Sequence, residues 1–137
     1  MTNVFSPTKS TEGKKNDRGK MRFDLITPEM EEALAEILTH GATKYEDRNW
    51  EKGIKYSRIY AALRRHLNAW VRGNIYDQES GFKHLNHALC CLAFLVTYEA
   101  RNMHLDWDDL HRQRESIRSR IDRIKLRGEI DDDSMSE

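Results

Sequence analysis

The sequence predicts an all-α protein, a bundle of about four helices. Apolar residues recur at helical spacing in four segments, and no segment alternates apolar and polar residues as a half-buried strand would. With 137 residues, the chain is long enough to bury a core in one domain. We expect a flexible arm over 1–15, the helical domain over 16–127 and a flexible acidic tail over 128–137, because arm and tail lack apolar spacing.

The first helix is expected to begin at Pro28. Thr27 offers a hydroxyl cap before it, and proline loses no hydrogen bond at the first helical position. One face then carries apolar residues at helical spacing: Met30, Leu34, Ile37 and Leu38. Gly41 either ends this helix or permits a close crossing if the helix continues towards Tyr45.

Three further helices are expected along the chain. The second covers 57–71, with Gly73 as its stop and an apolar stripe of Ile59, Leu63, Leu67 and Trp70. The third covers about 81–103, and its run ALCCLAFLV is apolar all round, which predicts the central helix. The fourth, LDWDDLHRQRESIRSRIDRIKLRGE, is strongly charged and is either solvent-facing or a dimer arm.

Composition excludes several classes of protein. The 23 basic and 23 acidic residues cancel, so net charge gives no reason to expect nucleic-acid binding. We expect no membrane association, because there is no basic-then-apolar leader and no apolar run near the ~20 residues of a membrane span. The adjacent Cys90 and Cys91 make a poor structural bridge and indicate buried thiols in a reducing cytoplasm.

Glu32 and Glu36 are the first candidates for chemistry. They are four residues apart on the predicted first helix, so both carboxylates point the same way and could share a divalent cation. At ~100° per residue they lie nearly opposite the apolar face. They are therefore either an ordinary solvated pair or a metal site that another helix or subunit covers.

The segment YDQESGFKHLNHA offers a second set. If Ser80 caps the third helix, Asp77 and Glu79 just upstream could hold a hard cation, while His84 and His87 one turn in could contact phosphate or water. Alternatively, the acids are caps and the histidines are satisfied polar residues at a helix end. Carboxylates dominate these candidate ligands, which favours Mg²⁺ or Mn²⁺ over zinc.

The segment KYEDRNW forms a third cluster. Lys44 and Arg48 could hold phosphates, Asn49 offers a two-way hydrogen-bonding edge, and Tyr45 or Trp50 could stack on a base. The alternative is that the two aromatic rings only anchor a loop onto the core.

Two basic segments complete the candidates. Lys20 and Arg22, beside a flexible glycine in DRGKMRFDL, belong to a segment that either folds over a ligand or stays solvated. In RRHLNAW, Arg64 and His66 pair with acids or face the same cleft.

In this order, DRGKMRFDLI, EEALAEILTHGATKYEDRNWEKGI, RRHLNAW and DQESGFKHLNHALCCLAFL together resemble the dATP/dGTP diphosphohydrolase domain common in phages. That family looks like a branch of the MazG-like all-α nucleoside triphosphate pyrophosphohydrolases. The resemblance covers about residues 14–98, and GATKYEDRNW and ESGFKHLNHA are its strongest parts. It departs from the MazG-like signature: EExxxE replaces EExxE, and no ExxD follows on the third helix.

The resemblance implies metal-dependent cleavage between the α and β phosphates of a purine nucleoside triphosphate, dGTP or dATP, releasing the monophosphate and pyrophosphate. It also implies a site completed in a homodimer or homotetramer, and a host-cytoplasm location for a phage-encoded enzyme. On this interpretation the metal ligands are Glu32 and Glu36 with Asp77 or Glu79, and a carboxylate or His87 takes the proton of water. Residues expected to bind substrate are Lys20, Arg22, Lys44, Arg48, Asn49, Trp50 and His84.

The alternative function is a small helical interaction or adaptor protein without catalysis. It would bind its partner through the charged fourth helix, with Ile117, Ile121 and Ile124 as the contact stripe.

Overall fold

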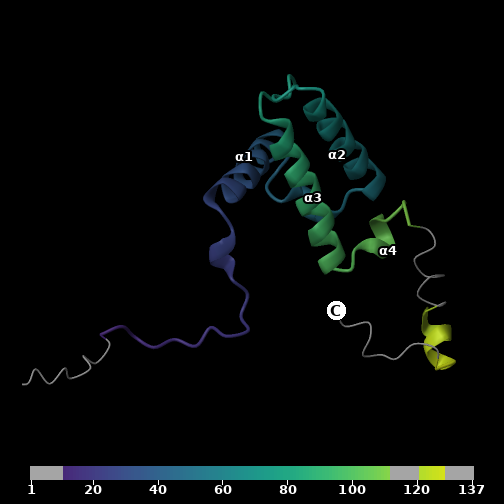
Figure 1. Cartoon of the computed structure of the whole chain (residues 1–137). Coiled ribbons are helices and arrows are strands. Elements are labelled where there is room, and N and C mark those ends of the chain that lie inside the picture. Colours follow the sequence, from purple (N-terminus) through teal and green to yellow (C-terminus); the bar gives the residue numbers. More distant parts are fainter. Residues whose placement is uncertain (1–10, 112–120, 129–137) are drawn as a thin grey trace, which may run out of the picture.

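The computed structural model describes residues 11–111 and 121–128. Three long helices pack together (Figure 1): α1 Pro28–Lys44, α2 Tyr56–Val71 and α3 His84–Ala100. Shorter helices are η1 Phe23–Leu25, η2 Asn49–Lys52 and α4 His104–Trp107, and residues 121–126 are also helical. Within the described residues there is no strand, only an isolated antiparallel bridge between Tyr76 and Lys83. The all-α prediction is confirmed, with three main helices.

Helix α1 begins where the sequence predicts and extends beyond Gly41. The Thr27 hydroxyl accepts a hydrogen bond from the backbone N–H of Met30 at 3.3 Å, with Pro28 in the first position. The helix then continues through Gly41 to Lys44. Gly41 is therefore an interior residue of α1 and not its end.

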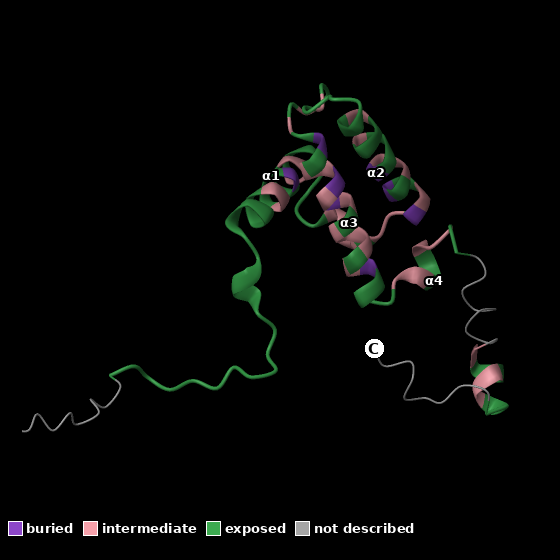
Figure 2. Cartoon of the chain, in the orientation of Figure 1, coloured by how far each residue is buried: buried purple, intermediate pink, exposed green. Residues whose placement is uncertain are grey.

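Helix α3 is the centre of the bundle, because it packs against both α1 and α2. The core cluster joins Tyr56 and Ile59 of α2 to Tyr98 of α3, which is fully buried and donates its hydroxyl proton to the backbone oxygen of Trp50. Figure 2 shows the buried residues where the helices face one another. The far side of α3 stays exposed, with Leu85, Leu92 and Val96 in solvent, because α1 and α2 cover only part of its circumference.

The expected second helix is observed, but its apolar stripe is buried only at one end. Ile59 and Leu63 are in the core, whereas Leu67 and Trp70 are exposed. The last turns of α2 therefore contribute little to the core.

The predicted fourth helix begins near the expected residue but is wrong in continuing past Trp107. Helix α4 ends at Trp107, and Asp108 adopts an extended conformation. Its carboxylate accepts hydrogen bonds from the backbone N–H groups of Leu110 and His111, both at 3.0 Å, which gives the backbone an alternative to the helix. Ile117 of the expected contact stripe lies outside the described residues.

The segment before α1 runs away from the bundle (Figure 1) and is exposed throughout residues 11–30. Most of the expected arm and tail lies outside the described residues, so the three-part division of the chain stays a prediction. Within the described part of the chain, no helix combines the length and apolar character that crossing a bilayer requires.

Candidate active site

Glu32 and Glu36 line an open cavity of about 570 Å³ between α1 and the start of α3. We call it the carboxylate pocket; its lining residues are Glu29, Glu32, Ala33, Glu36, Tyr76, Gly81, Phe82, Lys83 and Asn86. The Asn86 side-chain amide donates a hydrogen bond to Glu36 Oε2 at 2.8 Å. The acidic face of α1 is therefore partly walled by the start of α3, although both carboxylates remain accessible to solvent.

The donor chemistry of this pocket suits a hard divalent cation, because carboxylate and amide oxygens are the ligands that Mg²⁺ and Mn²⁺ prefer. No group of three or more His, Cys, Asp or Glu side chains gathers closely enough to hold a metal anywhere in 11–111 or 121–128. Mg²⁺ in nucleotide enzymes commonly takes one or two carboxylates and fills its other positions with water and substrate phosphates. The pair Glu32 and Glu36 fits a site of that kind.

Asp77 and Glu79 do not line the carboxylate pocket. The Asp77 carboxylate accepts hydrogen bonds from the Ser80 hydroxyl at 2.7 Å and the Ser80 backbone N–H at 3.1 Å. Burial alone would raise the pKa of Asp77, but these bonds outweigh burial and lower it. Asp77 faces a separate cavity with His84. The metal-binding role of Asp77 and Glu79 therefore stays a prediction, and one that this arrangement does not favour.

The expectation that Ser80 caps the third helix is wrong. Helix α3 begins at His84, after Lys83, and no side chain caps it. Ser80 lies four residues before His84, in a turn closed by a hydrogen bond from the Gly81 backbone N–H to the Asp77 backbone oxygen at 2.7 Å. Residues 81–83, which the prediction placed in the helix, belong instead to this turn and to the bridge between Tyr76 and Lys83.

Three histidines gather where the end of α2 meets the start of α3. His66 Nδ1 lies 2.9 Å from His84 Nδ1, and the rings of His66 and His87 stack in parallel at 4.4 Å. His87 Nε2 lies 2.7 Å from the Ser80 hydroxyl. Burial, followed by the nearby His87, lowers the pKa of His66 to about 4, and burial also lowers the pKa of His87. Both imidazoles are therefore neutral at pH 7.

His87 contacts the carboxylate pocket only indirectly. Phe82 lines the pocket, and its ring meets that of His87 edge-on at 6.4 Å, whereas His87 is not among the lining residues. The roles predicted for His87 as proton acceptor and His84 as substrate contact remain untested, and His84 is buried against His66.

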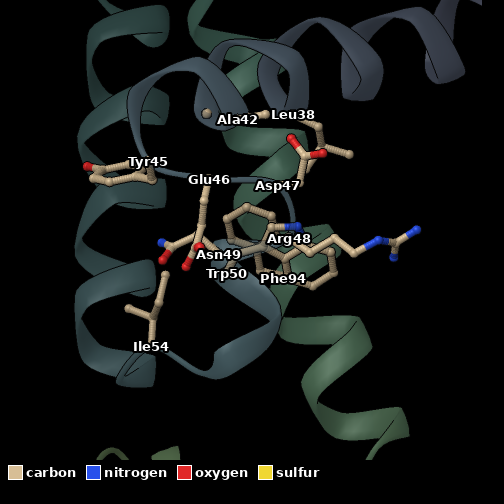
Figure 3. A pocket seen from close by; sticks show the side chains of 11 residues that line it. Leu38, Ala42, Tyr45, Glu46, Asp47, Arg48, Asn49, Trp50, Ile54 and Phe94 are labelled. Carbon is tan, nitrogen blue, oxygen red and sulfur yellow. The ribbon is translucent and has the colours of Figure 1, made fainter.

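Residues 45–50 of the segment KYEDRNW line a second cavity, of about 380 Å³, which we call the loop pocket (Figure 3). Its lining residues are Leu38, Gly41, Ala42, Tyr45, Glu46, Asp47, Arg48, Asn49, Trp50, Ile54 and Phe94. Trp50 stacks on Phe94 with ring centroids 4.5 Å apart and packs against the core, so it does anchor this loop. The Arg48 side chain extends away from the stacked rings and pairs with Glu51 at 3.2 Å.

The predicted substrate residues are spread over different parts of one chain. The loop pocket and the carboxylate pocket share no lining residue. Glu36 and Leu38, which line one pocket each, are ~200° apart around α1. Lys44 lies over the Tyr45 ring at 5.5 Å and lines neither pocket. In the exposed segment before α1, Arg22 pairs with Asp24 at 2.6 Å, and Lys20 lies nearby in sequence.

Asn86 and Lys83 wall the carboxylate pocket from the start of α3, and neither was predicted as a site residue. Their one signal was their position inside ESGFKHLNHA, a segment already marked by its histidines. Nothing local pairs Asn86 with a glutamate fifty residues earlier.

Comparison with known proteins gives a family match and a curated relative. The model for the N-terminal domain of dATP/dGTP diphosphohydrolase matches residues 10–108. A protein of Salmonella phage PMBT28, named dATP/dGTP diphosphohydrolase, is 37% identical over 83 residues, which are 61% of this chain and 28% of that relative. The chain thus spans little more than a quarter of the length of the curated relative. No solved structure matches the chain.

Proposed function

Because this chain belongs to the dATP/dGTP diphosphohydrolase N-terminal family, we propose that it is a metal-dependent pyrophosphohydrolase of purine deoxynucleoside triphosphates. Its reaction is the cleavage of dGTP or dATP to the nucleoside monophosphate and pyrophosphate. The observation that carries the proposal is the pair Glu32 and Glu36, which open into one pocket against the start of α3.

In this proposal, Glu32 and Glu36 hold Mg²⁺ or Mn²⁺. The bound ion supplies neutralisation of the phosphate charge and a lowered pKa for an attacking water. Asn86 orients the Glu36 carboxylate through its 2.8 Å hydrogen bond. Lys83, at the edge of the same pocket, supplies positive charge to the phosphates as negative charge develops there.

The proton of the attacking water goes to a carboxylate of this pocket. A proton acceptor must come within hydrogen-bond reach of the water, and the carboxylates line the pocket directly. His87 is a weaker candidate, because its Nε2 atom lies at the Ser80 hydroxyl and outside the pocket lining.

Assembly into a homodimer or homotetramer is part of the proposal. In one chain, the loop pocket with Arg48, Asn49 and Trp50 opens on a different side of α1 from the carboxylates. A second copy is the arrangement in which both sets of residues meet on one substrate.

The reaction is tested by incubating the protein with dGTP and Mn²⁺ and separating the products by chromatography. We expect dGMP and pyrophosphate. Formation of dGDP and orthophosphate, or no turnover of dGTP or dATP with Mg²⁺ or Mn²⁺, would contradict the proposal.

The site is tested by Glu32→Gln, with Glu31→Gln as a matched control. Glu31 is the chain neighbour of Glu32, is also exposed and does not line the carboxylate pocket. Loss of one metal-binding carboxylate should lower turnover by about 100-fold or more, whereas Glu31→Gln should retain activity. Circular dichroism should show unchanged helicity for both. A fully active Glu32→Gln would show that Glu32 is an ordinary solvated residue with no part in catalysis.

A further inference from the structure

A third cavity, of about 530 Å³, runs between α2 and α3 beside the loop that follows α1. We call it the arginine groove; it is lined by Tyr45, Asn49, Ile54, Arg58, Ile59, Ala61, Ala62, Arg65, Cys91 and Phe94. It shares Tyr45, Asn49, Ile54 and Phe94 with the loop pocket, so the two cavities adjoin. Its size lies within the ~300–1,000 Å³ range of small-molecule sites.

The charge of this groove is one-sided. Arg58 and Arg65 both line it, and none of its lining residues is acidic. The two arginines are seven residues apart on α2, which places them on the same side of the helix about 10 Å apart along its axis. Two guanidinium groups on one wall at this spacing suit an extended anion better than a single point charge.

Both guanidinium groups are available. Neither side chain forms an ion pair or hydrogen bond with any residue in the described ranges. Arg48 and Arg101, by contrast, each bind Glu51, at 3.2 and 2.9 Å. The wall of the groove therefore carries two unpaired guanidinium groups and no carboxylate.

The histidine cluster lies between this groove and the carboxylate pocket and is influenced by charges of both. The positive charge of Arg65 contributes to the lowered pKa of His66, whose ring stacks on that of His87. Glu36 in turn lies close enough to His87 to raise its pKa in part. The histidine cluster therefore lies within electrostatic reach of both Glu36 on α1 and Arg65 on α2.

We propose that Arg58 and Arg65 bind the phosphate chain of a nucleotide in the arginine groove. This inference rests on the proposed function and assigns phosphate-binding residues to it. Guanidinium groups bind phosphate oxygens with two parallel N–H donors, which fixes orientation as well as charge. The base then lies towards Tyr45, at the end shared with the loop pocket, where an exposed aromatic ring is available for stacking.

The test is isothermal titration calorimetry with inorganic triphosphate in buffer containing EDTA, so that no metal contributes. Arg65→Gln and Arg58→Gln are compared with Arg64→Gln, the matched control. Arg64 is the chain neighbour of Arg65, bonds to the Tyr60 hydroxyl at 2.6 Å and does not line the groove. We expect about tenfold weaker binding for each groove variant, the loss of one charge-assisted contact, and wild-type binding for Arg64→Gln.

Three results would overturn the inference: no binding of triphosphate by the wild-type protein, wild-type affinity in both groove variants, or an equal loss in Arg64→Gln. A parallel dGTP assay separates this inference from the proposed function. If the wild type turns over dGTP and Arg65→Gln has an unchanged KM, phosphate binding in the groove is contradicted and the proposed enzyme activity stands. If no protein turns over dGTP but Arg65→Gln binds triphosphate more weakly than the wild type, the proposed enzyme activity is contradicted and phosphate binding in the groove stands. Glu32→Gln, which lies outside the groove, should bind triphosphate in EDTA as the wild type does.

Discussion

The Glu36 carboxylate has its orientation set by an amide on another helix. Without the hydrogen bond from Asn86, the glutamate side chain would sample several rotamers in solvent. A metal ligand held in one orientation loses less conformational entropy on binding, so a supporting residue of this kind affects activity more than stability.

We therefore expect Asn86→Ala to lower dGTP turnover by about tenfold while the melting temperature changes little. Asn68→Ala, on the exposed side of α2, is the control and should behave as the wild type. Steady-state kinetics measure the turnover, and thermal melts the stability, of the wild type and both variants. Equal turnover in Asn86→Ala would show that Glu36 needs no support.

The histidine cluster makes stability depend on pH. The folded pKa of His66 is about 4, below its ordinary value of 6.5, chiefly because of burial and the nearby His87. The unfolded chain therefore binds more protons than the folded chain between these pH values. The free energy of unfolding is therefore highest above pH 6.5 and decreases as the pH falls towards 4.

We predict that the melting temperature of the wild type falls between pH 7 and pH 4.5, and that His66→Gln shows a smaller fall. His104→Gln is the control and should follow the wild-type profile. The carboxylates with lowered pKa, such as Asp77, titrate below this window and do not produce the effect. Identical profiles for the wild type and His66→Gln would assign the pH dependence to other groups.

Among the elements, the turn between η2 and α2 requires glycine. Gly53 has φ of 110°, and a Cβ atom there would overlap the indole ring of Trp107. Trp107 packs against the core cluster, so its ring has little room to move. The turn and α4 are therefore fitted to each other at this point.

Gly53→Ala should destabilise the protein by about 2 kcal/mol or more, because both backbone and tryptophan must shift. Gly41→Ala is the contrasting variant: Gly41 lies inside α1, and a Cβ atom added there would meet nothing within 4 Å, so alanine should stabilise by up to ~1 kcal/mol. Urea unfolding measures both changes. A neutral Gly53→Ala would mean that Trp107 is not fixed by the core.

The elements that could be predicted from sequence are those whose signals are local. Thr27 and Pro28 mark the start of α1 because cap and first turn are neighbours in the chain. The apolar run of α3 predicted the central helix for the same reason. The start of α3 was missed because an antiparallel bridge and a turn compete for its first residues. The fourth helix was predicted to continue past Trp107, whereas the Asp108 side chain binds the backbone beyond it.

At the scale of the whole molecule, the contacts that assemble the candidate site join residues far apart in sequence. The carboxylate pair could be predicted from the spacing of Glu32 and Glu36, since one helix positions both. The bond of Glu36 to Asn86 and the stacking of His66 on His87 depend on how helices cross, which the spacing of residues does not determine. The arginine groove was missed for the same reason, because its walls come from α2, α3 and the loop after α1.

Helix α2 is capped from the far end of the domain. No side chain adjacent to its start caps it, but the Asp109 carboxylate accepts hydrogen bonds from the Ser57 hydroxyl and, at 2.8 Å, from the Ser57 backbone N–H. These bonds lower the pKa of Asp109. The carboxylate also lies at the positive end of the α2 dipole, where negative charge is favoured.

Asp109→Ala should therefore lower the melting temperature, and Asp106→Ala, an exposed acid in α4, should not. Differential scanning calorimetry of the two variants beside the wild type makes the comparison. If both variants melt with the wild type, the cap from Asp109 contributes nothing to stability.

This long-range cap also bears on the order in which the protein can be made and folded. A nascent chain emerging from the ribosome has all of α1, α2 and α3 available before residue 109 appears, yet the first turn of α2 still lacks its acceptor. Translation must therefore pass this aspartate before the first turn of α2 acquires its cap, so the domain completes its folding only after residue 109 has left the ribosome.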